Sequence, residues 1–380
     1  MIAGGDSVKE KMKYCTRCVM PSTRPRVTFN DKGVCNACQW AEEKKNLDWD
    51  SRWKQLLGLC EKHKKRNPQG FNCIVPVSGG KDSSYVAYKM KYELGMNPLC
   101  VTVNPPLQIE LGKRNLERFI DCGFDVIAIT PNPVMVQKVS RREFVEHGQP
   151  LHSWMISVQV AILRIAINFR IPFIMFGEEG ETEYGGTTAL KNQPFYDIEY
   201  SKKIYLSGYD SDMLFRSLDV KENEKYWWTF PSEKEFEELS PEITHWSYFE
   251  NWDSYKHYLY AKEKCGLSER NNRNISTYIG FAQNDTLLYD LHCYLMFLKF
   301  GFGRCTTDVG IDIRRGAMSR KEAVEQLKKY DGEYPEPYIE KYLDFFEMTQ
   351  KEFDGVLDRF VNRDLFKKVN GRWKPLFVPE

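Results

Sequence analysis

The chain has 380 residues, of which 42% are hydrophobic, 28% charged and 14% aromatic. This composition is typical of a globular protein and excludes long disordered tracts, and the length suffices for one large domain or two domains. Lysine and arginine together number 54, against 53 for aspartate and glutamate, which excludes the overall basic field that nucleic-acid binding usually requires.

The cysteine content indicates the compartment. Eleven cysteines are present, without an apolar leader at residues 1–10. We also find no run of about 18 apolar residues that could form a membrane span. Secreted proteins with many cysteines usually begin with such a leader. We therefore expect a cytoplasmic protein with reduced thiols.

Two cysteine pairs lie near the N-terminus. Cys15-x-x-Cys18 and Cys35-x-x-Cys38 are separated by 16 residues. This spacing lets four thiolates converge on one ion and is typical of a structural zinc site without an open position. We predict that residues 13–45 form a small lobe that the metal stabilises. An iron–sulfur cluster and redox disulfides are the alternatives for the same cysteines.

Strand and helix patterns alternate after a polar connecting helix predicted over 46–70. The run 71–77 is almost continuously apolar, as expected for a strand buried on both faces of a parallel sheet. Further strands are predicted at 98–103, 125–130 and 172–176, and helices at 83–94, 113–122 and 153–169. This alternation indicates a doubly wound α/β sheet, in a domain that we place at 71–195.

The remaining chain is divided by its pattern. Residues 196–270 are irregular and rich in aromatic side chains, and we interpret them as an insertion and a candidate substrate cap. Residues 271–380 are assigned to the rest of the catalytic domain, with amphipathic helices from residue 319 to the end.

The segment between the first predicted strand and helix reads Ser78-Gly79-Gly80-Lys81-Asp82-Ser83-Ser84. Backbone N–H groups at a helix N-terminus suit an anion, and Lys81 adds a positive charge. A Walker A loop requires glycine at position 75 and serine or threonine at 82, where the chain has Val75 and Asp82. We therefore predict the SGGxDS loop of the N-type (PP-loop) ATP pyrophosphatases, which cleave ATP between the α and β phosphates.

This loop supplies the predicted ATP site. Residues 78–84 are expected to bind the phosphates, with Lys81 and Asp82 as catalytic residues. Asp82 is either a magnesium ligand or a first-turn acid favoured by the helix dipole. Asn104 ends the second predicted strand, where a base or ribose would rest.

An acidic segment, 176–186, follows the fourth predicted strand. Loops at the carboxyl ends of parallel strands bind ligands in open α/β sheets, so this segment should face the phosphate loop. We expect Glu178 to be catalytic, and Glu179 and Glu183 to bind substrate or magnesium. The alternative is a solvated acidic loop.

A later segment, 307–320, contains three arginines. Arginine suits bidentate capture of phosphate or carboxylate, and we take Asp308, Arg314 and Arg320 as further candidates for binding substrate or magnesium. The alternative is a surface charge run. The histidines, His257 among them, are assigned no role.

Five motifs together resemble those of the bacterial N-acetyl sugar amidotransferases, from Lys13 to the C-terminal helices. They are the two CxxC pairs, IVPVSGGKDSS at 74–84, VTVNPPLQIELGKRNLERFIDCGFD at 101–125, GEEGETEYGG at 177–186 and TTDVGIDIRRGAMSRKEA at 306–323. The resemblance implies an adenine nucleotide α-hydrolase-like fold that uses ATP, Mg²⁺ and structural Zn²⁺.

The resemblance also implies a reaction. An acetamido group on a nucleotide-activated sugar becomes an acetamidino group, with release of AMP and pyrophosphate, during synthesis of lipopolysaccharide O-antigen or a related surface glycan. It further implies two partners, a glutaminase and a cyclase-like barrel subunit, that supply ammonia. The alternatives are a tRNA-modifying PP-loop enzyme of the thiolating or lysidine synthetase type, and an ATP-binding regulatory subunit of a glycan assembly complex.

Overall fold

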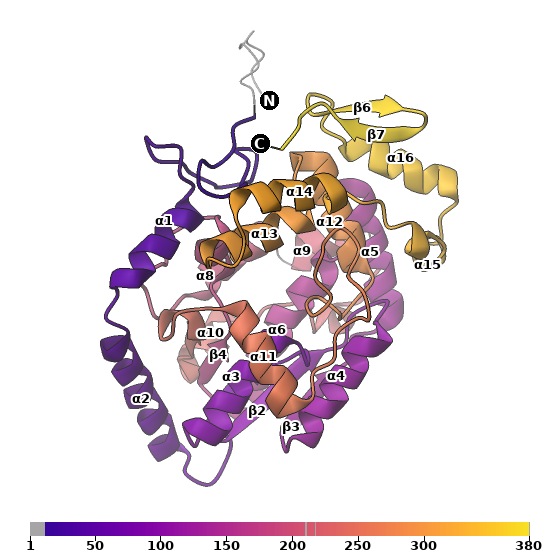
Figure 1. Ribbon diagram of the computed structural model, residues 1–380. Coiled ribbons are helices and arrows are strands. Elements are labelled where there is room, and N and C mark those ends of the chain that lie inside the picture. Colours follow the sequence, from indigo (N-terminus) through magenta and orange to yellow (C-terminus); the bar gives the residue numbers. More distant parts are fainter. Residues whose placement is uncertain (1–11, 210, 217, 380) are drawn as a thin grey trace.

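The central feature of the fold is a five-stranded parallel sheet in the order β3-β2-β1-β4-β5 (Figure 1). The computed structural model describes residues 12–209, 211–216 and 218–379, so residues 1–10, discussed above for their lack of an apolar leader, lie outside the described part. The strands are β1 (Cys73–Pro76), β2 (Pro98–Val103), β3 (Asp125–Ile129), β4 (Phe173–Phe176) and β5 (Glu242–His245). The predicted doubly wound α/β sheet is confirmed.

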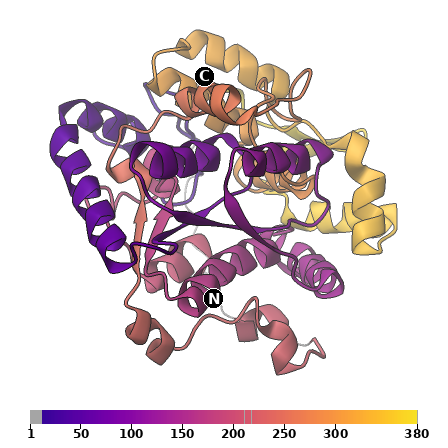
Figure 2. The same ribbon diagram turned by 90° about the horizontal axis from the view of Figure 1, so that it is seen from below.

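Helices cover both faces of this sheet (Figure 2). Cys73 and Val75 of β1 face one apolar core, whereas Ile74 faces another, as the two-residue period of a strand requires. The first core is closed by α2 (Trp49–Arg66), α3 (Lys81–Tyr88), α4 (Glu110–Asp121) and α11 (Ser254–Cys265). The second is closed by α6 (His152–Phe169) and α10 (Glu233–Leu239), and α5 (Pro133–His147) packs beside α6.

Four of these elements, β5, α5, α10 and α11, were not predicted. Strand β5 pairs in parallel with β4, so part of segment 196–270 belongs to the main sheet. Three of its four residues are polar, so the strand carries no apolar periodic signal. Helix α5 does carry local signals, because the Asn132 side chain accepts hydrogen bonds from the backbone N–H groups of Val134 and Met135, and Pro133 occupies the first turn. The predicted domain limits stay predictions.

The remaining short helices lie between these elements. They are α1 (Asn36–Glu43), α7 (Gly180–Tyr184), α8 (Ile198–Tyr200) and α9 (Ser211–Phe215). None of the helices within the described part of the chain is both long enough and apolar enough to cross a bilayer.

The C-terminal part is helical, as predicted, except at its end. Its helices are α12 (Leu288–Phe300), α13 (Arg304–Arg314), α14 (Arg320–Tyr330), α15 (Ile339–Phe346) and α16 (Gln350–Phe360). The prediction of helices to the end is wrong, because β6 (Phe366–Val369) and β7 (Arg372–Pro375) form an antiparallel hairpin. Asn370 and Gly371 both have positive φ at its turn, the geometry that favours Asn-Gly. Most of the arginine segment is also helical, within α13.

Candidate active site

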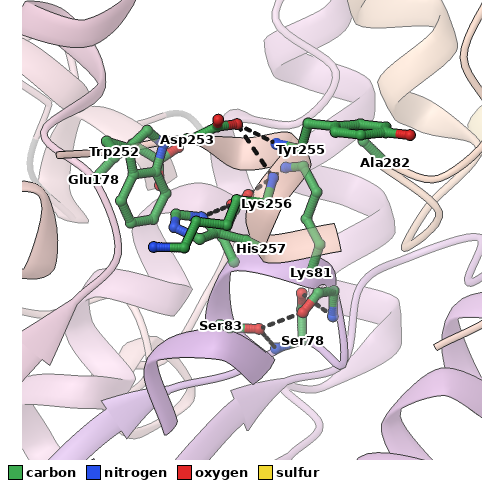
Figure 3. A network of polar contacts seen from close by, with 12 residues as sticks. Ser78, Lys81, Ser83, Glu178, Trp252, Asp253, Tyr255, Lys256, His257 and Ala282 are labelled. Atoms are coloured by element: carbon green, nitrogen blue, oxygen red, sulfur yellow. Dashed lines mark hydrogen bonds and ion pairs between the residues drawn. The ribbon is translucent and has the colours of Figure 1, made fainter. Parts of the chain in front are cut away.

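The phosphate loop joins the end of β1 to the start of α3. The Ser78 N–H donates to Ser83 Oγ at 3.2 Å, and Ser83 Oγ donates to the Gly80 carbonyl at 3.3 Å. The Gly80 N–H lies 3.4 Å from Ser78 Oγ. Figure 3 shows Ser78 and Ser83 at the base of the site, with Lys81 extending away from them. Hydrogen bonds of its own serines thus fix the shape of the loop, and α3 begins directly at Lys81.

Two glycines allow α4 to lie close to this loop. A Cβ added to Gly79, whose φ is +75°, would lie 2.4 Å from the Leu116 nitrogen. A Cβ added to Gly112 would lie 2.3 Å from the Asn284 carbonyl oxygen. Real atoms cannot approach so closely. Helix α4 is therefore in contact with the phosphate loop on one side and with segment 281–285 on the other.

We predict that Gly112→Ala destabilises the protein by about 1–3 kcal/mol, because a methyl group forces α4 and the Asn284 backbone apart. The same change should raise the KM for ATP, since segment 281–285 lines the phosphate-loop cavity. Urea unfolding and ATP titration check both effects. Gly355→Ala is the matched control, because that helical glycine has open space around it. A Gly112→Ala variant as stable as the control would contradict the packing argument.

The site lies where the strand order reverses. Strands β2 and β3 extend the sheet on one side of β1, and β4 and β5 extend it on the other. Open α/β sheets bind ligands in the crevice at such a switch point. A cavity of about 190 Å³ is found there, lined by residues 78–83, Gly112, Asn115, Gly177, Glu178 and 281–285.

Asp82 lies between a lysine and a histidine. It contacts the Lys81 ammonium, and His257 Nδ1 of α11 donates to its carboxylate at 3.0 Å. Burial acts to raise the pKa of Asp82, but Lys81 and His257 outweigh it and the pKa is lowered. The His257 ring is fixed by Tyr85 and Trp252, with ring centroids 4.1 and 4.3 Å away. Asp82 is therefore kept as a carboxylate in a fixed position.

Glu178 has the opposite electrostatic environment. It lines the phosphate-loop cavity with Lys81 and Asp82, and Tyr184 donates to its carboxylate at 3.2 Å. Burial, followed by the negative charge of Asp82, raises the pKa of Glu178 to about 7. Burial also raises the pKa of Asp285, in the same cavity, to about 6. This excess of carboxylates is suited to a divalent cation such as Mg²⁺, which prefers oxygen ligands.

The raised pKa of Glu178 predicts a pH-dependent stability. A carboxyl whose pKa rises on folding stabilises the protein fully below its unfolded pKa, and this contribution is lost as the pH rises through about 7. The ligand-free Glu178→Gln variant should therefore gain stability over the wild type at pH 8.5 but not at low pH. Since the carboxyl lines an open cavity, we expect about 1–2 kcal/mol.

Thermal unfolding of both proteins at pH 4 and 8.5 checks this prediction. Glu117→Gln, on the exposed surface of α4, is the matched control. A Glu178→Gln difference that is the same at both pH values would contradict the assignment.

The other acidic residues of segment 176–186 have protein partners. Glu179 accepts hydrogen bonds from the Thr182 N–H at 2.7 Å and from the Tyr205 hydroxyl at 2.6 Å. Glu183 accepts from Trp40 Nε1 and Lys44 Nζ, both at 2.8 Å. Of the candidates in this segment, Glu178 is the one that lines the cavity with the phosphate loop.

The remaining candidates are divided between two places. Asp308 accepts from Thr277 Oγ1 at 2.6 Å and lines a second cavity that also includes Lys81 and Asp82. Arg320 Nε donates to the Cys18 carbonyl at 3.0 Å. Arg314 lines a cavity with Ala37 and Trp40 of the cysteine lobe. Burial acts to lower the pKa of Arg314, but the negative charge of the cysteine thiolates outweighs it and the pKa is raised.

Asn104 follows β2 as predicted. Its side-chain amide donates to Thr130 Oγ1, just beyond β3, at 2.7 Å. The role of Asn104 in nucleotide binding stays a prediction.

The four cysteines form one buried cluster. Their sulfur atoms lie within 4.8 Å of one another, and the Cys18 and Cys35 sulfurs are 3.7 Å apart. Tetrahedral zinc with Zn–S bonds of about 2.3 Å requires S···S distances of about 3.8 Å. The N–H groups of Cys18 and Cys35 point to Cys15 Sγ, at 3.4 and 3.2 Å, as expected around a thiolate. The donor set and its geometry therefore fit Zn²⁺.

Three residues of the site were missed in the sequence. His257, Asp285 and Arg304 come from segments far from the phosphate loop, and none belongs to a local motif. The sequence carries no signal that brings them together.

Comparison with known proteins finds a family similarity in the C-terminal part. Residues 242–377 match the family described as LPS biosynthesis protein WbpG-like, C-terminal domain. No curated protein matches the chain.

Several solved structures are similar to parts of the chain. A predicted subunit of tRNA methyltransferase from Methanocaldococcus jannaschii is 16% identical, over 49% of this chain and 73% of that chain, with a TM-score of 0.27. The NH3-dependent NAD synthetase from Campylobacter jejuni is 13% identical, over 49% and 99%, with a TM-score of 0.29. The NMN synthetase from Francisella tularensis is 12% identical, over 60% and 100%, with a TM-score of 0.28.

The family match includes β5, α11 to α16 and the residues His257, Asp285, Arg304 and Asp308. It agrees with the resemblance to surface-polysaccharide enzymes found in the sequence. Over residues 242–377 the chain is therefore similar to the C-terminal domain of the WbpG-like LPS biosynthesis proteins.

Proposed function

We propose that this protein is an ATP-dependent amidotransferase that converts the acetamido group of a nucleotide-activated N-acetyl sugar into an acetamidino group. The observation that carries the proposal is the junction of two cavities. Lys81, Asp82 and Glu178 line both the phosphate-loop cavity and a larger cavity formed by the WbpG-like part of the chain. An acceptor in the larger cavity could thus reach ATP bound at the phosphate loop.

The reaction needs ATP because an amide is a poor electrophile. The acetamido oxygen attacks the α-phosphorus, pyrophosphate leaves, and an O-adenylyl imidate is formed. Ammonia then adds to the imidate carbon, and AMP leaves with the former amide oxygen. No protein nucleophile takes part.

The loop and the charged residues Lys81, Asp82 and Glu178 each have a role in this scheme. The N–H groups of the loop and Lys81 stabilise the charge that develops on the phosphates. Asp82, positioned by His257, would hold Mg²⁺, which supplies further charge neutralisation on the phosphates. Glu178, with a pKa of about 7, accepts the proton released when ammonia adds to the imidate.

The proposal extends to the surroundings of this site. Zn²⁺ in the four-cysteine lobe has a structural role. A glutaminase and a cyclase-like barrel subunit supply the ammonia, and the product enters lipopolysaccharide O-antigen or a related surface glycan. We place the reaction in the cytoplasm, where ATP and nucleotide sugars are made.

The test is incubation of the full chain with ATP, Mg²⁺, ammonium chloride and candidate nucleotide sugars that carry acetamido groups. Mass spectrometry should show oxygen replaced by NH in the sugar, with AMP and pyrophosphate as the other products. Formation of ADP and phosphate, or no turnover with any acetamido sugar, would overturn the proposal.

A further inference from the structure

Two cavities lie beyond the phosphate loop, and we call them the inner and the outer cavity. The inner cavity, of about 270 Å³, includes Lys81, Asp82 and Glu178 at one end. The outer cavity, of about 280 Å³, lies between α1, α7, α11 and α13. Tyr184, Ser254 and Ile311 line both. The inner cavity therefore adjoins the phosphate loop at one end and the outer cavity at these shared residues.

The inner cavity combines aromatic and polar side chains. Its aromatic members are Tyr184, Tyr255, Tyr278, Phe281 and Tyr289, and its carboxylates include Asp308 and Asp312. Aromatic faces pack against the C–H groups of a sugar ring, and carboxylates accept hydrogen bonds from its hydroxyls. In Figure 3, Tyr255 lies next to Ala282, above Lys81. The size and lining of this cavity suit one sugar ring.

Arg304 gives the inner cavity an unused donor. The residue is only 3% exposed, its Nε donates to Asp308 at 3.1 Å, and its guanidinium lies 5.0 Å from the centre of the Tyr289 ring. Its Nη1 is buried without a hydrogen-bond partner in the described part of the chain. A buried guanidinium N–H without an acceptor is unfavourable, so an oxygen atom of a ligand would satisfy it.

The outer cavity is basic. Two tryptophans, Trp40 and Trp252, form part of its wall. Four cationic side chains line it, namely Lys44, Lys45, Arg314 and Arg315. Only two carboxylates do so, those of Glu183 and Asp253. Nη1 of Arg314 is a second buried guanidinium atom without a partner among the described residues. Arginine and lysine beside aromatic rings suit a phosphorylated, ring-containing group.

We propose that the two cavities form one acceptor site for a nucleoside diphosphate sugar. The acetamido sugar occupies the inner cavity, where Arg304 donates to one of its oxygens. The diphosphate and nucleoside occupy the outer cavity, where Arg314 and Arg315 bind the phosphates. This inference rests on the proposed function for the reaction, but the site itself can be tested without turnover.

The experiment compares two probes on the full chain, UDP-N-acetylglucosamine and free N-acetylglucosamine, by ligand-observed NMR titration. The wild type should bind the nucleotide sugar more tightly. Arg315→Gln should lower the affinity for the nucleotide sugar about tenfold, equivalent to about 1.4 kcal/mol, and leave the affinity for the free sugar unchanged. Tyr255→Ala should lower the affinity for both probes. Both side chains are partly exposed, so both variants should fold.

Arg114→Gln, on the exposed surface of α4, is the matched control and should change neither affinity. Equal affinity of the wild type for the two probes would overturn the assignment of the outer cavity. Unchanged binding in Tyr255→Ala would overturn that of the inner cavity. If binding follows the expected pattern but no acetamido sugar yields AMP and pyrophosphate, the proposed function fails and the binding site stands.

Discussion

Asp82→Ala should lower kcat at least about 100-fold, the scale expected when a group that stabilises transition-state charge is removed. The carboxylate contacts Lys81 and His257 and is the candidate Mg²⁺ ligand within the phosphate loop itself. Its loss would remove this proposed ligand and leave Lys81 without the carboxylate that it contacts. Pyrophosphate release, measured over a series of Mg²⁺ concentrations, is the readout.

Three comparisons make this experiment specific. Asp121→Ala removes an exposed carboxylate at the end of α4 and should leave the rate unchanged. His257→Ala removes the hydrogen bond to Asp82 and should cost about 10- to 100-fold, since a hydrogen bond to a charged group contributes about 1.5–3 kcal/mol. ATP binding should persist in Asp82→Ala because the loop N–H groups remain. A wild-type rate in Asp82→Ala would remove this residue from the mechanism.

The parts of the site that are formed by residues close together in the sequence were predictable. The loop at 78–84 and the CxxC pairs are local motifs, in which a few neighbouring residues determine both the backbone shape and the chemistry. The same holds for β1 and β2, whose apolar runs are buried on both faces. These features require no knowledge of how distant segments pack.

Features that depend on packing were not predictable. From the sequence, all three of Glu178, Glu179 and Glu183 are candidates for the site, because they share one acidic segment. Tertiary contacts distinguish them, because Tyr200 and Tyr205 donate to Glu179, and Lys44 pairs with Glu183. The partnership of His257 with Asp82 likewise joins residues 175 positions apart.

Packing also determines what the arginine segment, 307–320, does. Its charges predict an anion site, but helix α13 directs Asp308 into the inner cavity and places Arg314 at the cysteine lobe and the outer cavity. Helical periodicity, together with the position of α13 against the lobe, separates residues that are close in sequence (Figure 1). One segment thus contributes to two sites.

Cys35→Ser should remove the bound metal and destabilise the whole chain by several kcal/mol, since structural zinc contributes about 10–16 kcal/mol of apparent binding free energy in small zinc domains. The lobe also contacts helices α7 and α14 of the rest of the chain. Arg26 of the lobe forms two hydrogen bonds of 2.7 Å with Glu181 of α7, and Arg320 of α14 donates to the Cys18 carbonyl. Loss of the metal should therefore loosen α7, which contributes Tyr184 to both cavities, and lower turnover as well.

Metal analysis and thermal unfolding, with and without a chelator, measure these effects. The wild type should contain one zinc ion per chain and lose stability when it is chelated. Cys122→Ser is the matched control, because that partly exposed cysteine lies outside the cluster and a hydroxyl can replace its thiol. Iron in place of zinc would favour the cluster alternative. A Cys35→Ser variant with full metal content and wild-type stability would show that the four sulfurs, although they converge within 4.8 Å, do not act as one site.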